Sequence, residues 1–230
     1  MISPINKRLL CCASLVRDGA VLGDVGTDHG YLPIYLLKVG KIDRAVLSDI
    51  NEGPLSKARE NVSENSLCDK CRLVLCDGAS AISDLGITDY CIAGMGGELI
   101  ASILSKAPHL KDGAIRLVLQ PMSRPEALRA FLWDNGFRII TEQYVVDDGK
   151  KYVCICAEYK GEPVDYSVAD SYFGKEECFL NVSPAMLEYM NERKCALLRM
   201  IEGKHRGGID ARDDEELFSE LVRRLSGRDI

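Results

Sequence analysis

The sequence predicts an α/β protein with a mostly parallel sheet, followed by a small C-terminal domain of two helices. Short apolar runs alternate with helix-like segments between residues 20 and 135, which is typical of βαβ units. Acids or glycine-rich turns follow these runs, as expected where parallel strands end at a ligand crevice. The pattern changes near residue 161, so we expect domains at 1–160 and 161–230.

The composition is that of an ordinary globular protein, with 47% hydrophobic and 28% charged residues in a chain of 230. No apolar run reaches the length of a membrane span, and the N-terminal stretch lacks a signal-peptide pattern, so we expect a cytoplasmic protein. Ten cysteines in that setting predict thiols rather than disulfides. The net charge of −6 argues against a nucleic-acid partner without excluding one, because most of it comes from residues 161–230.

Residues 4–18 predict a short amphipathic helix that ends at Gly19. We expect its apolar face to consist of Leu9, Leu10, Ala13 and Val16. Three cations lie off that face and either point into solvent or contact a phosphate beside a site, namely Lys7, Arg8 and Arg17.

The next stretch predicts the opening of a nucleotide-binding crevice. A strand begins at Ala20 and ends in Asp24, a glycine-bearing turn follows, and a helix covers residues 31–39. The fingerprint G-x-G-x-x-G is absent, because Asp28 occupies the place of a middle glycine. The observed order of acid and glycines fits the first motif of a methyltransferase better than a dinucleotide turn. An ordinary βα turn with two glycines stays open as the alternative.

Two further strands also end in acids. Residues 44–49 predict a strand ending in Asp49, at the usual interval for a carboxylate that binds ribose hydroxyls. A helix follows, with a buried stripe of Leu55, Ala58 and Val62. The strand at 71–76 is followed by Asp77, in the place where methyltransferases commonly receive the adenine amine. Each acid alone would be an ordinary turn residue, but three in succession indicate one site.

The later elements extend the same pattern. A strand at 89–93 runs into the turn at 94–98, where backbone amides and open space suit a flat methyl acceptor. A strand at 114–119, a helix at 124–135 and two strands at 137–146 and 151–159 follow. The last two predict an antiparallel hairpin, which is typical of methyltransferases and foreign to dinucleotide dehydrogenases.

Residues 161–183 are expected to form linker and turn. Residues 184–204 and 213–225 predict two antiparallel helices joined by a Gly-Gly loop. The hairpin serves either self-packing and dimerisation or contact with RNA through Arg193, Lys194, Arg199, Lys204 and Arg206.

The pair Cys68 and Cys71 has zinc-ligand spacing, but a structural zinc site needs four ligands. The other cysteines, Cys76 and the pair Cys154 and Cys156, do not complete such a pattern. We therefore expect buried or unpaired thiols and no metal.

Three segments together resemble one family: DVGTDHGYLP, IAGMGG and LVLQPMSRPEALRAFLWDNGFRI, in that order. They resemble the bacterial tRNA (adenine-22 N1)-methyltransferases, the TrmK family, over nearly the full chain. The resemblance implies a class I Rossmann-like methyltransferase with a seven-stranded, mostly parallel sheet and a coiled-coil-like C-terminal domain. It implies S-adenosyl-L-methionine as cofactor and tRNA as substrate. The sequence shows no sign of an obligate protein partner, and both a monomer and a homodimer stay open.

The resemblance and the chemistry of the residues together give three groups of expected site residues. The cofactor-binding group is Asp24, Gly26, Thr27, Gly30, Asp49, Ile50, Asp77, Gly78, Gly94 and Met95. The substrate-binding group is Lys7, Arg8, Gly96, Gly97 and Arg124. The catalytic group is Asp28, His29, Tyr31 and Gln120, where Gln120 is preferred because Met122 departs from the family pattern.

The chemistry of the acceptor supports the catalytic group. N1 of neutral adenine has a free lone pair, and methylation leaves a positive charge on the ring. A carboxylate nearby would stabilise that charge and accept a proton from N6, and we expect Asp28 to do so. A base taken out of its stack needs an aromatic platform, for which Tyr31 is the candidate. His29 supports this pair or only stabilises the loop.

Three other functions stay open. A small-molecule methyltransferase would share the cofactor half of the site. A nicotinamide-dependent oxidoreductase is disfavoured by the missing middle glycine and the terminal hairpin. A non-catalytic RNA-binding or assembly protein would use the C-terminal helices alone.

Overall fold

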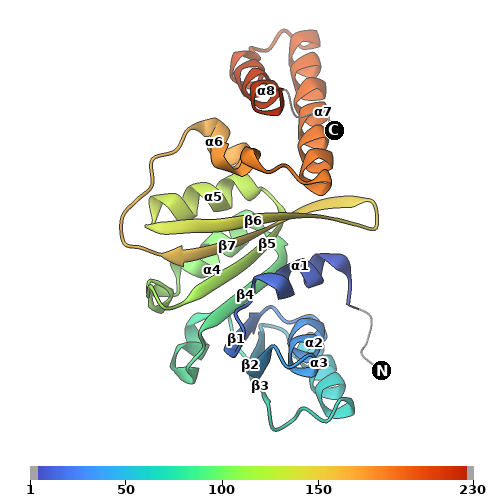
Figure 1. Cartoon of the computed structure of the whole chain (residues 1–230), viewed down its shortest axis with the longest axis vertical. Coiled ribbons are helices and arrows are strands. Elements are labelled where there is room, and N and C mark those ends of the chain that lie inside the picture. Colours follow the sequence, from blue (N-terminus) through green and yellow to red (C-terminus); the bar gives the residue numbers. More distant parts are fainter. Residues whose placement is uncertain (1–4, 227–230) are drawn as a thin grey trace.

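The computed structural model describes residues 5–226 and contains one seven-stranded sheet (Figure 1). The spatial order is β3-β2-β1-β4-β5-β7-β6, in which β7 is antiparallel to both neighbours and the other pairs are parallel. The strands are β1 (Ala20–Val25), β2 (Ile42–Asp49), β3 (Cys71–Leu75), β4 (Asp89–Gly96), β5 (Arg116–Ser123), β6 (Phe137–Asp147) and β7 (Lys150–Tyr159). The predicted fold class and the terminal hairpin are confirmed.

Helices cover both faces of the sheet (Figure 1). One face carries α1 (Lys7–Leu15), α2 (Tyr31–Lys38) and α3 (Glu52–Glu64), and the other carries α4 (Gly97–Ser105) and α5 (Pro125–Asp134). Because side chains alternate along a strand, neighbours such as Cys91 and Ile92 belong to different core layers. The same holds for Val46 and Leu47. The predicted stripe of the α3 helix is buried as expected.

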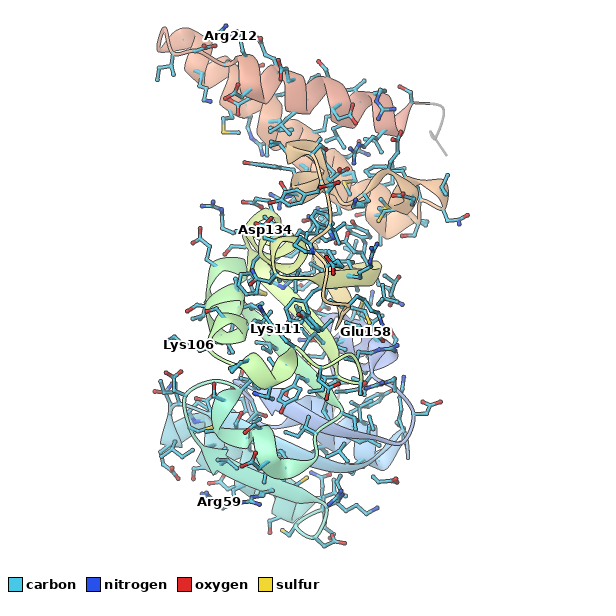
Figure 2. All side chains as sticks on the ribbon, turned by 90° about the vertical axis from the view of Figure 1, so that its left-hand side faces the viewer. Arg59, Lys106, Lys111, Asp134, Glu158 and Arg212 are labelled. Carbon is cyan, nitrogen blue, oxygen red and sulfur yellow. The ribbon has the colours of Figure 1, made fainter. Side chains whose placement is uncertain are left out.

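The C-terminal helices lie at one end of the molecule (Figure 1). They are α6 (Val168–Phe173), α7 (Pro184–Arg206) and α8 (Arg212–Leu225), and short 3₁₀ turns occur at Ser80–Leu85, Pro108–Leu110 and Glu176–Leu180. Figure 2 places Arg212, at the start of α8, and Arg59, on α3, at opposite ends of the molecule. The apolar residues of α7 and α8 join the core layer that contains α4 and α5.

The expectation of linker and turn for residues 161–183 is wrong, because α6 and a 3₁₀ turn occupy much of this segment. Ser167 and Asp170 form a capping box at the start of α6. Phe173 and Phe179 are buried, with 1% and 0% of their surface exposed. A segment anchored by two separate aromatic rings shows no regular spacing of apolar residues. Hydrophobic periodicity therefore does not predict its helix or its 3₁₀ turn.

Two strands run farther than expected. Pairing between β4 and β5 continues past two register shifts to join Met95 with Pro121 and Gly96 with Ser123. The glycines therefore lie within an irregular strand end instead of a separate turn. Such bulged pairing depends on the partner strand, which a local sequence pattern does not contain.

The first helix is shorter than expected, because the backbone of Val16 is extended. Arg17 explains the change in direction, since its backbone N–H and its Nε both donate to the buried carboxylate of Asp89 at 2.8 Å. Arg17 is thus held in the fold by Asp89 and does not point freely into solvent. Leu10, expected on the apolar face, has 37% of its surface exposed.

A buried ion pair connects the sheet to the C-terminal segment. The guanidinium of Arg129 on α5 lies 2.6 Å from the carboxylate of Glu142 on β6, and both side chains are almost fully buried. Tyr144 donates to the same carboxylate at 2.8 Å. Arg129 also donates to the backbone carbonyls of Ser171 and Tyr172 on α6.

None of the helices within residues 5–226 combines the length and the apolarity that crossing a bilayer requires.

Candidate functional site

The carboxyl ends of the five parallel strands meet at one edge of the sheet. β1 lies between β2 and β4, so the connections diverge on either side of it and leave a crevice outside the ends of β1 and β4. The predicted cofactor residues occupy the ends of β1, β2 and β4 and the loop that follows β3. This edge is the candidate site.

The loop after β1 is held tightly by the protein itself. The backbone N–H groups of Gly26 and Thr27 both donate to the carbonyl of Ser48 on β2. Gly26 has φ of +74°, and a Cβ there would overlap the side chain of Met95. Gly30 has φ of +71°, and a Cβ there would lie 2.9 Å from Leu47. Both positions therefore favour glycine, and Gly30 allows close packing against Leu47 on β2.

Asp24 lies beneath this loop, with 8% of its surface exposed. Thr27 donates its hydroxyl to the carboxylate at 2.5 Å. Burial raises the pKa of Asp24 to about 6, although the bond from Thr27 opposes the rise. An acid held in this way favours a cationic ligand, because a nearby positive charge would restore its ionised form.

Asp28, His29 and Tyr31 form a small group at the mouth of the loop. His29 Nε2 lies 3.0 Å from Asp28 Oδ1, and the rings of His29 and Tyr31 stack with centroids 5.4 Å apart. Asn61 on α3 donates to the backbone carbonyl of His29, which adopts a positive φ of 62°. Asp28 is exposed and Tyr31 is 39% exposed, so both are accessible to a ligand.

The loops after β2 and β3 present further acids. Asp49 accepts a hydrogen bond from the backbone N–H of Asn51, which leaves its other carboxylate oxygen available. Ile50 is 61% exposed and Asp77 is also exposed. Gly78 has φ of +72°. These are the features expected of a surface that receives hydroxyls and an amine.

The ends of β4 and β5 are joined through Gln120, which is fully buried. Its carbonyl oxygen accepts from Arg8 Nη1 at 2.6 Å and from the backbone N–H of Gly94 at 3.1 Å. Its Nε2 donates to the carbonyl of Pro121. With both lone pairs of the carbonyl occupied, Gln120 is suited to position Arg8 and Gly94 rather than to react.

The predicted substrate residues differ in their surroundings. Arg8 lies inside the site on Gln120, whereas Lys7 is exposed on α1. A Cβ at Gly97 would overlap the backbone carbonyl of Arg124, so this turn is closely packed. Arg124 is exposed, has a positive φ of 53° and pairs with Glu126 at 2.7 Å.

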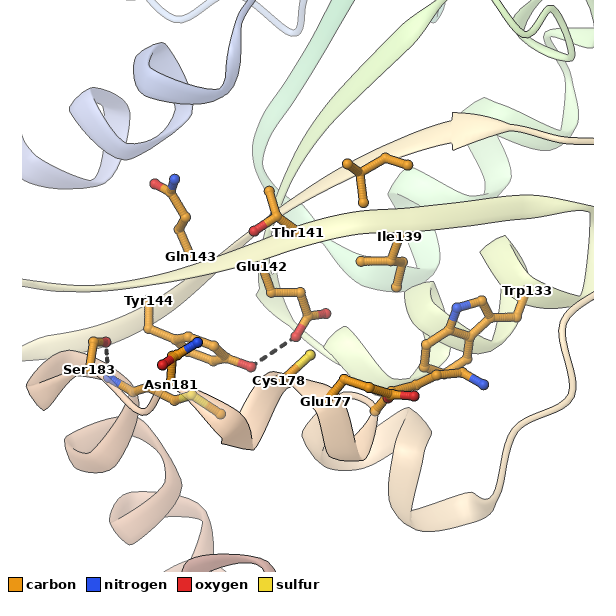
Figure 3. A pocket seen from close by; sticks show the side chains of 13 residues that line it. Trp133, Ile139, Thr141, Glu142, Gln143, Tyr144, Glu177, Cys178, Asn181 and Ser183 are labelled. Atoms are coloured by element: carbon orange, nitrogen blue, oxygen red, sulfur yellow. Dashed lines mark hydrogen bonds between the residues drawn. The ribbon is translucent and has the colours of Figure 1, made fainter. Parts of the chain in front are cut away.

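A well-formed cavity of the described chain lies elsewhere. It measures about 670 Å³ and lies between β6 and residues 175–186 (Figure 3). Two carboxylates line it, Glu142 and Glu177, and Glu142 is already bonded by Tyr144 and by Arg129. None of the residues predicted from the sequence lines it. We therefore place the candidate site at the strand ends, where the predicted groups occur together.

The cysteines do not form a metal centre within residues 5–226, where no group of three or more potential ligands occurs. Cys68 is exposed, and burial raises the pKa of Cys71 to about 12. Cys154 and Cys156 are both buried in the sheet. All ten cysteines are free.

Several residues at the site were not predicted. Ser48 holds the first loop through its backbone carbonyl, which any residue could offer, and Asn61 holds it through its side-chain amide from a distant helix. Tyr152 lies under the Arg8 guanidinium, 6.0 Å from it, although 144 positions separate the two residues in the chain. Only the hairpin topology brings them together, so no local signal could have indicated this contact.

Comparisons with known proteins agree with this geometry. The family described as "Methyltransferase domain" matches residues 5–155. The tRNA (adenine(22)-N(1))-methyltransferase of Bacillus subtilis (strain 168) is 34% identical over 154 residues, which cover 67% of this chain and 65% of that protein. The match thus spans slightly less than two thirds of that relative's length.

Solved structures match over more of the chain. Sp1610 of Streptococcus pneumoniae, in complex with S-adenosyl-L-methionine, has a TM-score of 0.83 at 33% identity and covers 95% of this chain and 100% of its own. The Bacillus subtilis M1A22 tRNA methyltransferase TrmK has a TM-score of 0.79 at 27% identity, with 96% of each chain covered. Both therefore include the C-terminal helices in the match.

Proposed function

Because the chain belongs to the TrmK family of methyltransferases, we propose that it transfers the methyl group of S-adenosyl-L-methionine to N1 of adenine 22 in tRNA. The observation that carries the proposal is the extent of the match with Sp1610, which spans the C-terminal helices as well as the sheet. A tRNA substrate is consistent with a cytoplasmic location and with ten free thiols.

The residues at the strand ends fit this cofactor. Asp49 has a free carboxylate oxygen for ribose hydroxyls, and Asp77 is exposed where an adenine amine can donate to it. The ammonium of the cofactor's amino-acid end would stabilise the ionised form of Asp24, whose pKa is raised to about 6 mainly by burial. When bound, S-adenosyl-L-methionine supplies an electrophilic methyl group attached to a sulfonium.

Asp28 would act on the acceptor ring. N1 of adenine already has a free lone pair, so the chain does not have to generate the nucleophile. The Asp28 carboxylate would stabilise the positive charge that develops on the adenine ring and take a proton from N6. Tyr31 stacks on His29 and exposes part of its surface, so it offers a platform for an unstacked base.

The experiment is a methyl-transfer assay with labelled S-adenosyl-L-methionine and two tRNA transcripts that differ only at position 22, one with adenine and one with guanine. We expect label in the first transcript alone, and mass spectrometry should locate it as 1-methyladenine. Label in both transcripts would contradict methylation at position 22. Label only in small acceptors would indicate a small-molecule methyltransferase, and binding of tRNA without cofactor affinity would indicate a non-catalytic protein.

A further inference from the structure

A groove of about 420 Å³ begins where the acceptor side of the candidate site ends. Its walls are the turn at Pro121–Pro125, the start of β7 at Lys151–Val153 and one face of α7. Pro121 directly follows Gln120, whose side chain accepts a hydrogen bond from the backbone N–H of Gly94. The groove therefore continues from the end of β5 that is bonded to the end of β4. We refer to it as the β5–α7 groove.

We propose that the β5–α7 groove binds a nucleotide of the tRNA strand that adjoins the target adenine. This inference rests on the proposed function and specifies which face of the C-terminal helices contacts the substrate. A volume of this order accommodates a single nucleotide. Its position beside the acceptor turn suits the neighbour of a base that has left its stack.

The charges of the groove favour a polyanion. Four cations line it, Arg124, Lys151, Arg193 and Arg199, against two acids, Glu126 and Glu192. This excess of positive charge contrasts with the net charge of −6 of the whole chain. A local basic surface is what a phosphate backbone requires.

Arg199 is the cation most available to a ligand. Lys151 pairs with Glu192 at 3.1 Å, and Arg193 lies 3.8 Å from Glu126. Arg199 is exposed and has no hydrogen bond or ion pair within residues 5–226. Its guanidinium can therefore bind a phosphate without giving up a partner in the protein.

Glu126 adds an acceptor without a donor. Its Oε1 accepts from Arg124 Nε at 2.7 Å, whereas its buried Oε2 lies 3.8 Å from the Arg193 guanidinium and accepts no hydrogen bond. Buried acceptors are normally hydrogen-bonded, so an oxygen in a groove that has only a distant ion pair can accept a hydrogen bond from a ligand. A 2′-hydroxyl or an exocyclic amine of a nucleotide provides such a donor.

Tyr152 connects the groove to the acceptor side. It lines the groove, and its ring lies 6.0 Å from the Arg8 guanidinium that is bonded to Gln120. An aromatic ring at this point can stack on a base and keep the strand in register with the crevice.

The test compares two charge reversals on α7. Arg199→Glu changes the groove. Lys194, a candidate RNA contact by sequence, does not line the groove and lies on the opposite side of the same helix, as follows from 3.6 residues per turn. Lys194→Glu is therefore the control for a charge change outside the groove. With the adenine-22 transcript, we expect Arg199→Glu to raise KM for tRNA about tenfold. The kcat at saturating tRNA and the Kd for S-adenosyl-L-methionine should stay unchanged, and Lys194→Glu should resemble the wild type.

The outcomes separate the groove from the proposed function. If the wild type methylates the transcript and Arg199→Glu has the wild-type KM, or Lys194→Glu raises KM equally, the groove is excluded while the function stands. If the wild type neither binds nor methylates tRNA, the proposed function fails and the groove proposal fails with it. Unchanged cofactor affinity shows in each case that the variants are folded.

Glu126→Gln distinguishes a ligand acceptor from a counterion. If Glu126 accepts a hydrogen bond from a nucleotide, the amide variant should raise KM for tRNA several-fold. If Glu126 only neutralises neighbouring arginines, removal of its charge should lower KM, and that result would overturn its assignment as an acceptor.

Discussion

The carboxyl group of Asp24 shows how one residue can oppose stability and serve binding. Its ordinary pKa is 3.8, and burial raises the pKa to about 6 in the folded protein. Because the folded state holds this proton more tightly, the stability of the cofactor-free protein falls as pH rises from about 4 to about 6. Above that range the buried charge is retained at a cost in stability.

Asp24→Asn should therefore stabilise the cofactor-free protein near neutral pH, by at most roughly 3 kcal/mol, since the carboxylate is replaced by a neutral group. It should also weaken the binding of S-adenosyl-L-methionine. Urea unfolding at pH 5 and pH 7.5 and a cofactor titration measure the two effects. A variant that is less stable than wild type at pH 7.5 would show that the bond from Thr27 outweighs desolvation.

Asp28→Asn should slow methyl transfer by roughly 10² or more while leaving cofactor affinity unchanged, because the amide keeps the shape but not the charge. Single-turnover rates on tRNA and a cofactor titration check this. Asp49→Ala is the complementary variant and should weaken cofactor binding instead. An intact rate for Asp28→Asn would remove Asp28 from the catalytic group.

At this scale the sequence predicts the residues that follow a strand pattern. Asp24 and Asp49 can be predicted because apolar runs end at them. Gly26 can be predicted because its turn needs a positive φ. Gln120 is found by position, but its role depends on two donors from distant segments. Tyr152 is not found, because its contact with Arg8 requires the whole sheet.

At the scale of elements, regular helices and strands are predicted well because their apolar residues recur at a fixed period. The irregular ends of β4 and β5 are not predicted, because whether two strands pair through a bulge depends on both strands together. The order of α6 is not predicted either, although Ser167 and Asp170 carry a capping signal. A six-residue helix is too short to show a period.

A substitution of Arg129 tests how strongly its buried ion pair joins α5, β6 and α6. Arg129→Met should destabilise the protein by about 3–5 kcal/mol, because it leaves the Glu142 carboxylate buried without its partner. Thermal or urea unfolding measures this. The double variant Arg129→Met/Glu142→Leu should recover part of the loss, and a single variant as stable as wild type would show that water reaches Glu142.

At the scale of the whole molecule, the C-terminal helices are continuous with the methyltransferase sheet. Phe173, Met190 and Leu221 belong to the same core layer as Ile100 and Leu128. Because α7 packs against β6 and β7, its position relative to the acceptor side is determined by the core. A groove between α7 and β5 can then keep a constant shape.

The charge distribution yields the last prediction. A chain with a net charge of −6 repels tRNA as a whole, so attraction depends on local cations such as the four in the β5–α7 groove. If about four phosphates are contacted, raising salt from about 50 to about 200 mM should raise KM for tRNA by roughly 50-fold. The Kd for S-adenosyl-L-methionine should change little, because this cofactor carries no phosphate and its binding releases no counterions from a nucleic acid. Arg199→Glu should reduce the salt slope by about 1. A KM for tRNA that does not depend on salt would mean that recognition depends on shape and stacking rather than on these cations.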